Sequence, residues 1–584
     1  MQAVNVSAAR RSLLPAAARR GALAAGALAL AIALGGGAVP ADASADGVLR
    51  VHLLWTNDLH GHIGPEGARF MNPNFPPPLG GAASAAAYIK RVRETAAAAG
   101  EEVLLVDVGD MFQGTPVGTK TQGTAVIEYF NHIGYDLAVP GNHDFDLGRQ
   151  NTARLAGLSR FPWLCANLVE KDTGKVVDWC RPTLMIERGG LKIGVVGIIT
   201  PGTASMSFPA NIEGLEFRPM AETVAKYRDE LKAQGARLVF LAIHEGLPFD
   251  AEQAWRKRAE SAEDDAQQPQ RSFGTYGGQG LDGLVAQVPG IDFAVGGHTH
   301  RGYTEPWVDP VTHTVCFESY GNGSSLGHAI LEIDRRTGGL IGWDGPHDQG
   351  VLVSLFEDEI WPDEPTRQVI RPWLEKTDAE MNRVVGRLAV NLPRGGAGNN
   401  LVGNLVTDAM RARFKADLAI QNLGGLRADM QSGDITARDV FNVLPFGNEL
   451  VVAKVPGELL LRLFERKVSA TSGGICVSGA QVVFNPDRPD GQRLCALTIA
   501  GAPIDAARIY TVVLTNYLME GNSGLDMLTA VPEKDVEPTR LTDGEALEAY
   551  LREQQGAVHP KLDDRWLEQK GCARAAYLPP AGAS

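Results

Sequence analysis

Five short apolar segments, each followed directly by polar residues, most constrain the fold of this chain. The segments are Val51–Trp55, Val103–Val108, Leu137–Val139, Leu238–Ile243 and Phe293–Val295. Helix-like stretches such as Ala82–Ala99 and Met220–Gln234 lie between them. This alternation predicts an α/β domain with helices over a sheet, running from Val51 to about Ile341. Ligands of such domains bind beyond the carboxyl ends of the strands, so the polar residues are expected to share one edge.

Those polar residues are of the types that bind metal ions. They are Asp58-Leu59-His60, Gly109-Asp110, Gly141-Asn142-His143-Asp144, His244-Glu245 and Gly296-Gly297-His298-Thr299-His300. Asp, Asn and His offer oxygen and imidazole nitrogen to Zn, Mn or Fe. Any one motif alone is more typical of a turn or a core histidine, but five at successive strand ends have no ordinary structural explanation. The set predicts a centre of two divalent ions, bridged by Asp110, that hold a hydroxide and neutralise phosphate oxygens.

The length of 584 residues is too great for one hydrophobic core and predicts two or three domains. A second region begins after Glu364-Pro365, where Thr366–Asn382 is predicted to be one exposed helix. From about Val384 to Leu551 the chain again mixes helix and strand, with enough apolar residues for a core of its own. The polar stretch Ala251–Gly280 lacks periodicity and is expected to be a surface insertion.

The charge balance restricts the partners. Lys and Arg number 55 against 69 Asp and Glu, a formal net charge of −14. An acidic chain without a basic run disfavours a nucleic acid polymer as partner. A small phosphorylated substrate remains compatible, because bound metal ions reverse the local field. Nothing in the sequence indicates the oligomeric state.

The N-terminus has the pattern of a bacterial export signal. Arg10, Arg11, Arg19 and Arg20 precede an apolar run from Gly21 to about Leu34, and Ala-x-Ala sites follow near residue 43. This predicts a signal peptide over residues 1–45 and a periplasmic or extracellular protein, by a Sec or a twin-arginine route. The alternative is a retained membrane anchor. The apolar run is short for a stable membrane span, and no other stretch reaches membrane length.

Export permits disulfides, and the chain has six cysteines. Cys165 with Cys180, and Cys476 with Cys495, each flank an apparent strand-turn-strand, which favours these two bridges. Cys316 and Cys572 remain, and the sequence alone leaves the pairing open. No two cysteines have the close spacing of a metal site.

The ordered series of strand-end motifs resembles the calcineurin-like metallophosphatase superfamily. The later motifs are Gly403-Asn404-Leu405-x-x-Asp408-Ala409, Asn422-x-Gly424-Gly425-x-Arg427 and Leu444-Pro445-Phe446-Gly447. With them the chain resembles the secreted 5′-nucleotidase family, which includes bacterial periplasmic UDP-sugar hydrolases and animal ecto-5′-nucleotidases. The resemblance implies an α/β (α+β) fold with a four-layer metallophosphatase-type β-sandwich, flanked by helices, over residues 46–347. A linker with a helix over 348–383, a mixed α/β substrate-binding domain over 384–560 and a tail over 561–584 would follow.

The same resemblance assigns the residues of the metal centre. One ion would be held by Asp58, His60, Asp110 and His300. The other would be held by Asp110, Asn142, His244 and His298. His143 matches the catalytic histidine that stabilises the transition state and the leaving group, and Asp146 would orient it.

A second set of residues would bind the substrate. Arg427 and Arg394 match arginines that grip the phosphate, for which a guanidinium is suited by its bidentate geometry. Asn422 belongs to the same motif as Arg427. Phe446 and Tyr517 fall where two aromatic rings sandwich the base.

One departure from the family bears on the substrate. The family has an acid that holds the ribose hydroxyls, and here Ser523 stands in its place. The resemblance implies removal of phosphate from nucleoside 5′-monophosphates, with UDP-sugars and 2′,3′-cyclic nucleotides as further substrates. The alternatives are a hydrolase of sugar phosphates or of a thiosulfohydrolase-like sulfur ester, and an inactive surface-binding protein. The complete ligand set and the His143-Asp146 pair argue against inactivity.

Overall fold

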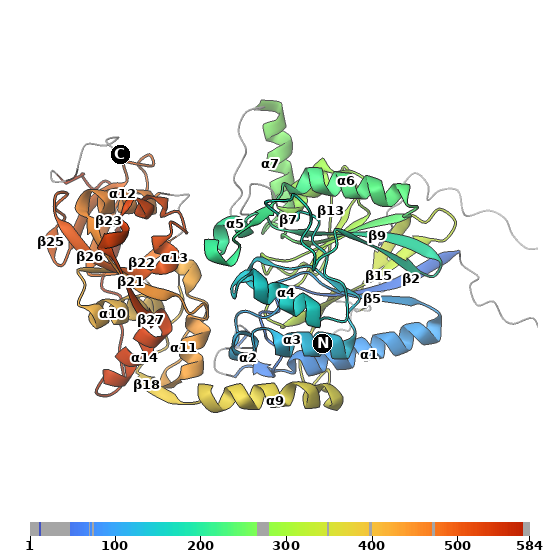
Figure 1. Ribbon diagram of the computed structural model, residues 1–584, viewed down its shortest axis with the longest axis horizontal. Helices are drawn as coiled ribbons and strands as arrows, with labels where there is room; N and C mark the ends of the chain where they lie inside the picture. Colours follow the sequence, from blue (N-terminus) through green and yellow to red (C-terminus); the bar gives the residue numbers. More distant parts are fainter. Residues whose placement is uncertain are drawn as a thin grey trace, which may run out of the picture. The chain divides into compact units, whose positions relative to one another are not determined.

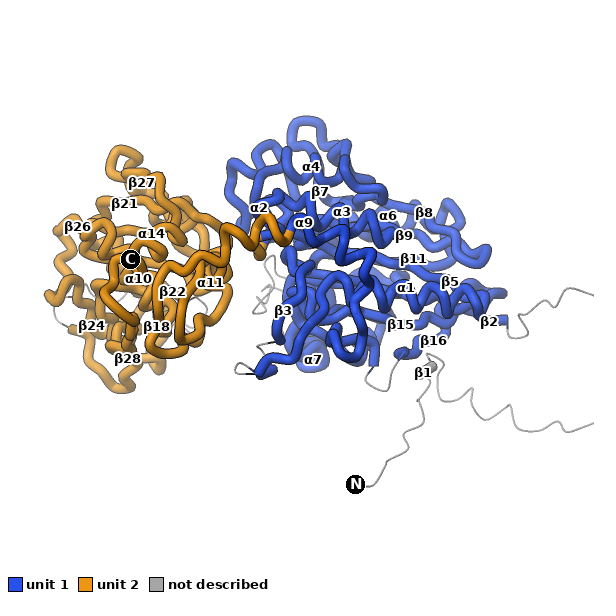
Figure 2. The backbone as a smooth tube through the Cα atoms, turned by 90° about the horizontal axis from the view of Figure 1, so that it is seen from below, with its two compact units in different colours: residues 1–113, 117–373 blue, residues 114–116, 374–584 orange. Residues whose placement is uncertain are grey.

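The computed structural model describes residues 11–12, 47–68, 71–72, 75–264, 280–346, 350–395, 400–469, 474–575 and 578. Apart from residues 11–12, the predicted signal peptide over 1–45 lies outside this part of the chain. The chain divides into two compact units, shown in two colours in Figure 2. Unit 1 comprises residues 1–113 and 117–373, and unit 2 comprises residues 114–116 and 374–584.

Unit 1 is built on two β-sheets. The first has the order β1-β16-β15-β2-β5-β6, with β17 paired to β15, and the second has the order β13-β14-β12-β11-β9-β8. The strands of the first sheet are β1 (Arg11–Ser12), β2 (Val48–Thr56), β5 (Glu102–Asp107), β6 (Leu137–Ala138), β15 (Ser325–Asp334), β16 (Leu340–Asp344) and β17 (Leu352–Ser354). Those of the second are β8 (Thr183–Arg188), β9 (Leu191–Ile199), β11 (Leu238–His244), β12 (Phe293–Gly296), β13 (Trp307–Val308) and β14 (Val315–Glu318). The neighbours β2, β5 and β6 are parallel, and so are β9, β11, β12 and β14.

The two sheets pack face to face and helices cover their outer faces (Figure 1). Leu53 and Val106 of the first sheet share one buried cluster with Val195, Phe240 and Val295 of the second. The outer face of the first sheet is covered by α1 (Gly81–Ala99) and α3 (Thr124–Ile133), and that of the second by α6 (Met220–Ala233) and α8 (Leu281–Gln287). These four layers confirm the metallophosphatase-type sandwich. Alternation of strands and helices alone predicted helices over one sheet, because it does not show that the strands divide between two.

Shorter elements connect these layers. They are β3 (Glu66–Gly67), β4 (Pro78–Leu79), α2 (Pro116–Lys120), α4 (Arg149–Leu158), β7 (Leu168–Glu170), α5 (Thr203–Met206), β10 (Leu215–Phe217) and α7 (Ala251–Asp264). The first half of the predicted surface insertion is therefore a helix. Its start is stabilised by Asp250, whose carboxylate accepts a hydrogen bond from the backbone N–H of Gln253 at 2.8 Å.

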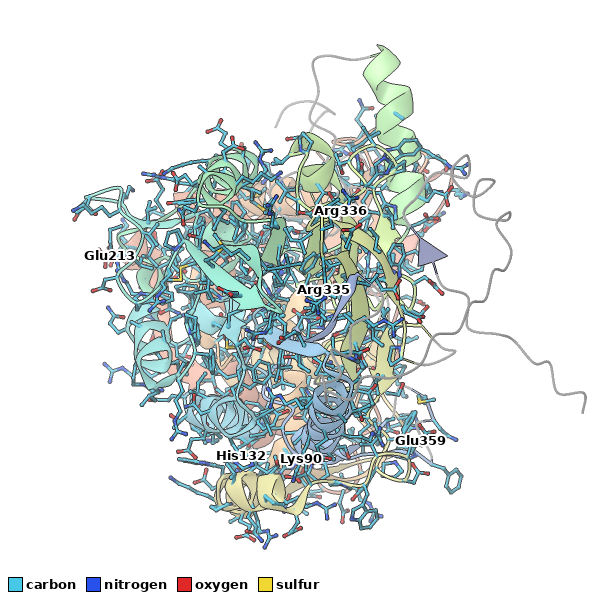
Figure 3. The ribbon with its side chains drawn as sticks, turned by 90° about the vertical axis from the view of Figure 1, so that its right-hand side faces the viewer. Lys90, His132, Glu213, Arg335, Arg336 and Glu359 are labelled. Carbon is cyan, nitrogen blue, oxygen red and sulfur yellow. A yellow bond between two sulfur atoms is a disulfide. The ribbon has the colours of Figure 1, made fainter. Side chains whose placement is uncertain are left out.

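Helix α9 (Glu364–Met381) forms where Thr366–Asn382 was predicted to be helical. The carboxylate of Asp363 accepts hydrogen bonds from the backbone and the hydroxyl of Thr366 at 3.1 and 2.8 Å, which caps the helix start. Nζ of Lys90 in α1 lies 3.7 Å from Oδ1 of Asp363. Figure 3 shows Lys90 and His132 beside this helix. Within the described residues, none of the helices is both long and apolar enough to span a membrane.

Unit 2 has a mixed five-stranded sheet in the order β22-β19-β26-β21-β27 and a smaller sheet in the order β25-β24-β23-β28. The strands are β18 (Val384–Leu388), β19 (Leu418–Asn422), β20 (Gly433–Thr436), β21 (Glu449–Pro456), β22 (Ile475–Ser478), β23 (Ala480–Phe484), β24 (Leu494–Ile499), β25 (Ala502–Pro503), β26 (Ile509–Thr515), β27 (Val536–Thr542) and β28 (Trp566–Glu568). The helices are α10 (Leu401–Phe414), α11 (Ala437–Val443), α12 (Gly457–Lys467), α13 (Asn516–Met519) and α14 (Asp543–Glu553). Helices α10, α11 and α14 pack in one apolar cluster and α12 packs in another.

The disulfides confirm one predicted bridge and show that the other is wrong. Cys165 is bonded to Cys180, as predicted. Cys495 is bonded to Cys572 rather than to Cys476. Cys476 lies on β22 in the five-stranded sheet, where its sulfur accepts from the Asn400 amide at 3.2 Å, whereas Cys495 lies on β24 in the other sheet. Closeness in sequence misled the prediction because the two cysteines belong to different sheets.

Candidate active site

The strand ends of unit 1 bring the predicted ligands into two groups. Asp58, His60 and His300 form the first metal group, and Asp110, His244 and His298 form the second metal group. Within each group the ligand atoms lie within 4.8 Å of one another. The two histidines that follow β12 divide between the groups, so the first metal group combines residues from both sheets.

Five of these residues have a left-handed backbone. The φ angles are 52° at Asp58, 49° at His60, 57° at Asp110, 73° at His298 and 55° at His300. A non-glycine residue in this region carries a cost of about 1–2 kcal/mol. Such conformations persist where the surroundings over-determine them, and they cluster at functional sites. The left-handed residues occur at alternate positions in Asp58-x-His60 and His298-x-His300, which supports a functional role for both loops.

Asp110 lies between the two groups. Its Oδ2 is 3.3 Å from Nε2 of His244 and 3.8 Å from Nε2 of His60, while its Oδ1 accepts a hydrogen bond from the backbone of His143 at 2.8 Å. A Cβ at Gly141 would lie 2.2 Å from Oδ1 of Asp110, so this approach requires glycine there. One oxygen of Asp110 therefore faces both groups, which is the arrangement of a bridging carboxylate.

Backbone carbonyls orient two of the histidines. Nδ1 of His60 lies 2.6 Å from the carbonyl of Gln113, and Nδ1 of His244 lies 2.7 Å from that of Val108. Each Nδ1 donates its proton to the carbonyl, so each Nε2 faces the site and offers a lone pair to a cation once its own proton is lost. Nε2 of His60 is only 3.0 Å from Nε2 of His300. Two ring nitrogens that close fit a shared cation, so the residues suit a bound metal ion.

The charges of the site favour cations. Burial opposes ionisation of Asp110, but the positive charges of His244 and His143 hold its pKa well below the usual range. Burial opposes a charge on His244 as well, yet Asp110 and Asp58 raise its pKa to about 10. Burial, and then the charge of His244, lower the pKa of His298 to about 3. The negative potential that retains a proton on His244 would equally attract a divalent cation.

The remaining residues predicted for this site lie beside the two groups. Oδ1 of Asn142 is 3.2 Å from Nε2 of His244, next to the second metal group. His143 is outside both groups, and its ring lies 5.4 Å from that of His60. Nδ1 of His143 and Oδ2 of Asp146 are 2.8 Å apart, which fixes the orientation and the tautomer of the imidazole.

In unit 2, the predicted substrate residues gather at one end of the five-stranded sheet. Asn422 ends β19 and Tyr517 follows β26; these strands are parallel, so both residues lie at the same edge. The guanidinium of Arg427 lies 5.7 Å above the ring of Phe446, which precedes β21. Asn422 is buried and its Oδ1 has no hydrogen-bond partner among the described residues.

Arg394 is brought next to Arg427. The guanidinium of Arg394 donates to the backbone carbonyl of Leu426 at 3.2 Å and lies 3.5 Å from the backbone carbonyl of Arg427. Both arginines are exposed. At the departure from the family, the carbonyl of Ser523 accepts a hydrogen bond from the amine of Lys467 at 2.5 Å. Asp526, the next acid along the chain, forms an ion pair with Arg466.

Sequence reasoning missed three residues that hold the ligand loops, namely Asn57, Glu318 and Ser319. Glu318 and Ser319 follow the apolar run Val315–Phe317 of β14. A polar pair directly after an apolar strand is the signal that revealed the other strand ends, and it could have revealed this one.

Comparison with known proteins agrees with this geometry. The model of the family "Calcineurin-like phosphoesterase" matches residues 51–302, and that of "5'-nucleotidase, C-terminal domain" matches residues 384–530. The chain joins a calcineurin-like phosphoesterase domain to a 5′-nucleotidase C-terminal domain. It is therefore a metal-dependent hydrolase of the phosphoesterase class.

Several relatives extend the likeness over most of the chain. A 5′-nucleotidase of Diplobatis ommata is 27% identical over 573 residues, which cover 89% of this chain and 90% of the relative. Endonuclease YhcR of Bacillus subtilis (strain 168) is 26% identical over 486 residues, 80% of this chain but only 37% of that longer protein. The crystal structure of a 5′-nucleotidase precursor from Thermus thermophilus has a TM-score of 0.74 at 25% identity, covering 90% of this chain and 100% of that one. The sulfate thiohydrolase SoxB of Thermus thermophilus has a TM-score of 0.69 at 19% identity, covering 90% and 97%, and shows the shared fold alone.

Proposed function

We propose that the protein removes phosphate from nucleoside 5′-monophosphates at a centre of two divalent metal ions. The observation that carries the proposal is the position of Asp110, whose Oδ2 faces a histidine of each metal group at 3.3 and 3.8 Å. A single carboxylate placed in this way is suited to bridge two ions. The 5′-nucleotidases among the relatives support a nucleotide as the substrate.

The residues of both sheets would hold the ions. Asp58, His60, Asp110 and His300 are proposed as ligands of the first ion. Asp110, Asn142, His244 and His298 are proposed as ligands of the second. The mixture of carboxylate, amide and imidazole donors suits Zn, Mn or Fe. When bound, two such ions neutralise phosphate oxygens and lower the pKa of a water from about 16 to about 7.

His143 is proposed as a catalytic residue that is not a ligand of either ion. A protonated imidazole at this position would stabilise negative charge on the phosphate and on the leaving oxygen. Asp146 would favour the protonated imidazole and hold its orientation through the 2.8 Å contact to Nδ1. Asp146 is thus a positioning residue, which acts through His143.

The edge of unit 2 supplies groups suited to the rest of a nucleotide. The exposed guanidinium groups of Arg427 and Arg394 would bind phosphate. The rings of Phe446 and Tyr517 would stack on the base, and the unpartnered Oδ1 of Asn422 would accept a hydrogen bond from the ligand. The approach of Arg427 to the ring of Phe446 supports one shared binding surface for phosphate and base.

Export to the periplasm or beyond the cell is part of the proposal. The arginine-rich and apolar N-terminal sequence supports it. The disulfides Cys165–Cys180 and Cys495–Cys572 support it independently, because such bonds persist in oxidising compartments.

A substrate comparison on protein loaded with Mn²⁺ or Zn²⁺ tests the proposal. Phosphate release would be measured from AMP, a sugar phosphate and a small aryl phosphate. UMP formation would be measured from UDP-glucose, and sulfate release from a thiosulfate ester. The expected result is the highest kcat/KM for AMP. Good turnover of another ester without hydrolysis of AMP would refute the nucleotide assignment. It would indicate that Ser523, in place of the expected acid, marks a substrate whose alcohol is not a nucleoside. Sulfate release alone would overturn the phosphatase assignment as well.

A further inference from the structure

The end of strand β14 carries two buried polar residues that belong to neither metal group. Glu318 and Ser319 each have a relative exposure of 0%. Strand β14 is the parallel neighbour of β12 in the second sheet. Each of the two residues contacts a different loop of the metal centre.

Glu318 holds the loop that carries the two histidines after β12. Its Oε1 accepts hydrogen bonds from the hydroxyl of Thr299 at 2.5 Å and from the backbone of Arg301 at 3.3 Å. Its Oε2 accepts from the backbone of Leu247, in the loop after β11, at 2.7 Å. Thr299 and Arg301 flank His300, so one carboxyl group fixes the chain on both sides of this proposed ligand.

Ser319 holds the loop after β2 through Asn57. The hydroxyl and the backbone N–H of Ser319 donate to Oδ1 of Asn57 at 2.7 and 3.1 Å. The amide nitrogen of Asn57 donates to the carbonyl of Ser319 at 2.9 Å and to Oδ2 of Asp58 at 2.7 Å. The amide of Asn57 therefore has a single orientation, which directs its second N–H at the carboxylate of Asp58.

The two contacts converge on the first metal group. Oδ1 of Asp58 is 3.4 Å from Nε2 of His300, across the two sheets, and the backbone of His298 donates to both oxygens of Asp58 at 3.0 and 2.8 Å. Asp58 and His300 have left-handed backbones, which need external support. The pair Glu318-Ser319 provides that support from one short segment for the ligands of both sheets.

We propose that Glu318 and Ser319 are positioning residues that set the metal affinity of the first metal group by fixing His300 and Asp58 against each other. The inference rests on the proposed metal centre. Partners that hydrogen-bond to metal ligands alter metal affinity by about 10–100-fold when they are removed. Removal of Glu318, which fixes the backbone around His300, is expected to have an effect of the same order. In the second metal group Asp110 comes from a loop that neither residue contacts and His244 lies within strand β11, so the affinity of this group should change less.

The test is a Mn²⁺ titration of the full chain after chelation and dialysis. Glu318→Met keeps the length of the side chain and removes the carboxyl group, and Ser319→Ala removes one donor to Asn57. Glu318→Gln keeps an oxygen for Leu247 and an N–H for Thr299, and Ser319→Thr keeps the hydroxyl. Asp292→Asn is the control, because Asp292 precedes β12 at the other end of the same sheet and binds the backbone of Val239 at 2.8 Å.

The expected result is a loss of about 10–100-fold in the affinity of one ion for Glu318→Met. Ser319→Ala should lower the affinity for the same ion by a smaller factor. The affinity of Glu318→Gln should lie between those of Glu318→Met and the parent. Ser319→Thr and Asp292→Asn should bind both ions with the affinities of the parent. The titration of Glu318→Met should resemble that of His300→Ala and differ from that of His244→Ala.

Unchanged binding of both ions by Glu318→Met and Ser319→Ala would overturn the inference, as would an equal loss in Asp292→Asn. If Glu318→Met does not fold, Ser319→Ala decides by the same criterion. A parent protein that binds no Mn²⁺ would instead refute the proposed metal centre, so the two failures are distinguishable.

Discussion

Removing Asp146 should slow catalysis only through its effect on His143. The structure places Oδ2 of Asp146 2.8 Å from Nδ1 of His143, and the two side chains are 18% and 19% exposed. Hydrogen bonds to charged groups contribute about 1.5–3 kcal/mol. Since about 1.4 kcal/mol corresponds to a factor of ten, Asp146→Ala should lower kcat by roughly 10–150-fold. Asp146→Asn should have a smaller effect, because an amide oxygen still accepts the bond without the charge.

His143→Ala should lower kcat further, by about 10²–10⁴-fold, the usual contribution of a positioned acid or base. The double variant should be no slower than His143→Ala, because Asp146 has no imidazole left to orient. The assay is steady-state phosphate release at saturating substrate, with metal content measured on every variant. Losses that multiply in the double variant would refute the coupling. Loss of metal from His143→Ala would refute the separation of catalyst and ligand.

Three further results are expected. Phe446→Ala should raise KM for AMP by roughly 5–150-fold, the equivalent of about 1–3 kcal/mol of base stacking. Hydrolysis of a small aryl phosphate should stay nearly unchanged. Equal loss on both substrates would show that the ring serves only to pack the fold. Replacing Cys495 and Cys572 by Ala should lower the free energy of unfolding by about 4 kcal/mol in urea titrations, because their bond closes a loop with a sequence separation of 77, and an unchanged midpoint would contradict this. Burial raises the pKa of Asp543 to about 7, so the folded state binds more protons than the unfolded chain and stability should fall as pH rises from about 4 to about 7. Asp543→Asn should reduce that dependence, and an identical urea profile for parent and variant between pH 4 and 7 would count against it.

The proposed ligands of unit 1 could be picked out from the sequence because their signal is local. Each of Asp58, Asp110, Asn142 and His244 follows or ends an apolar run that forms a buried strand, and parallel strands bring their ends to one edge. Local pattern does not show which strands share a sheet. It therefore predicted residues that the structure brings together, but with an incomplete architecture, in which His300 opposes Asp58 across two sheets.

Errors arose where long-range packing decides. Cys476 and Cys495 are near in sequence but lie on different sheets, and the partner of Cys495 is Cys572, far along the chain. The role of Glu318 depends on its bonds to Thr299, Arg301 and Leu247, which no pattern around residue 318 reveals. A single sequence specifies strands through periodicity, whereas these pairings depend on how the strands assemble.

Elemental analysis of the reconstituted protein and of Asp110→Ala shows whether Asp110 bridges two metal ions. We expect two divalent transition-metal ions per chain in the parent, because Asp110 lies within reach of both metal groups. We expect reduced occupancy together with lost phosphate release in Asp110→Ala. A parent that binds one ion or none, or an Asp110→Ala variant that retains two, would contradict the bridged metal centre.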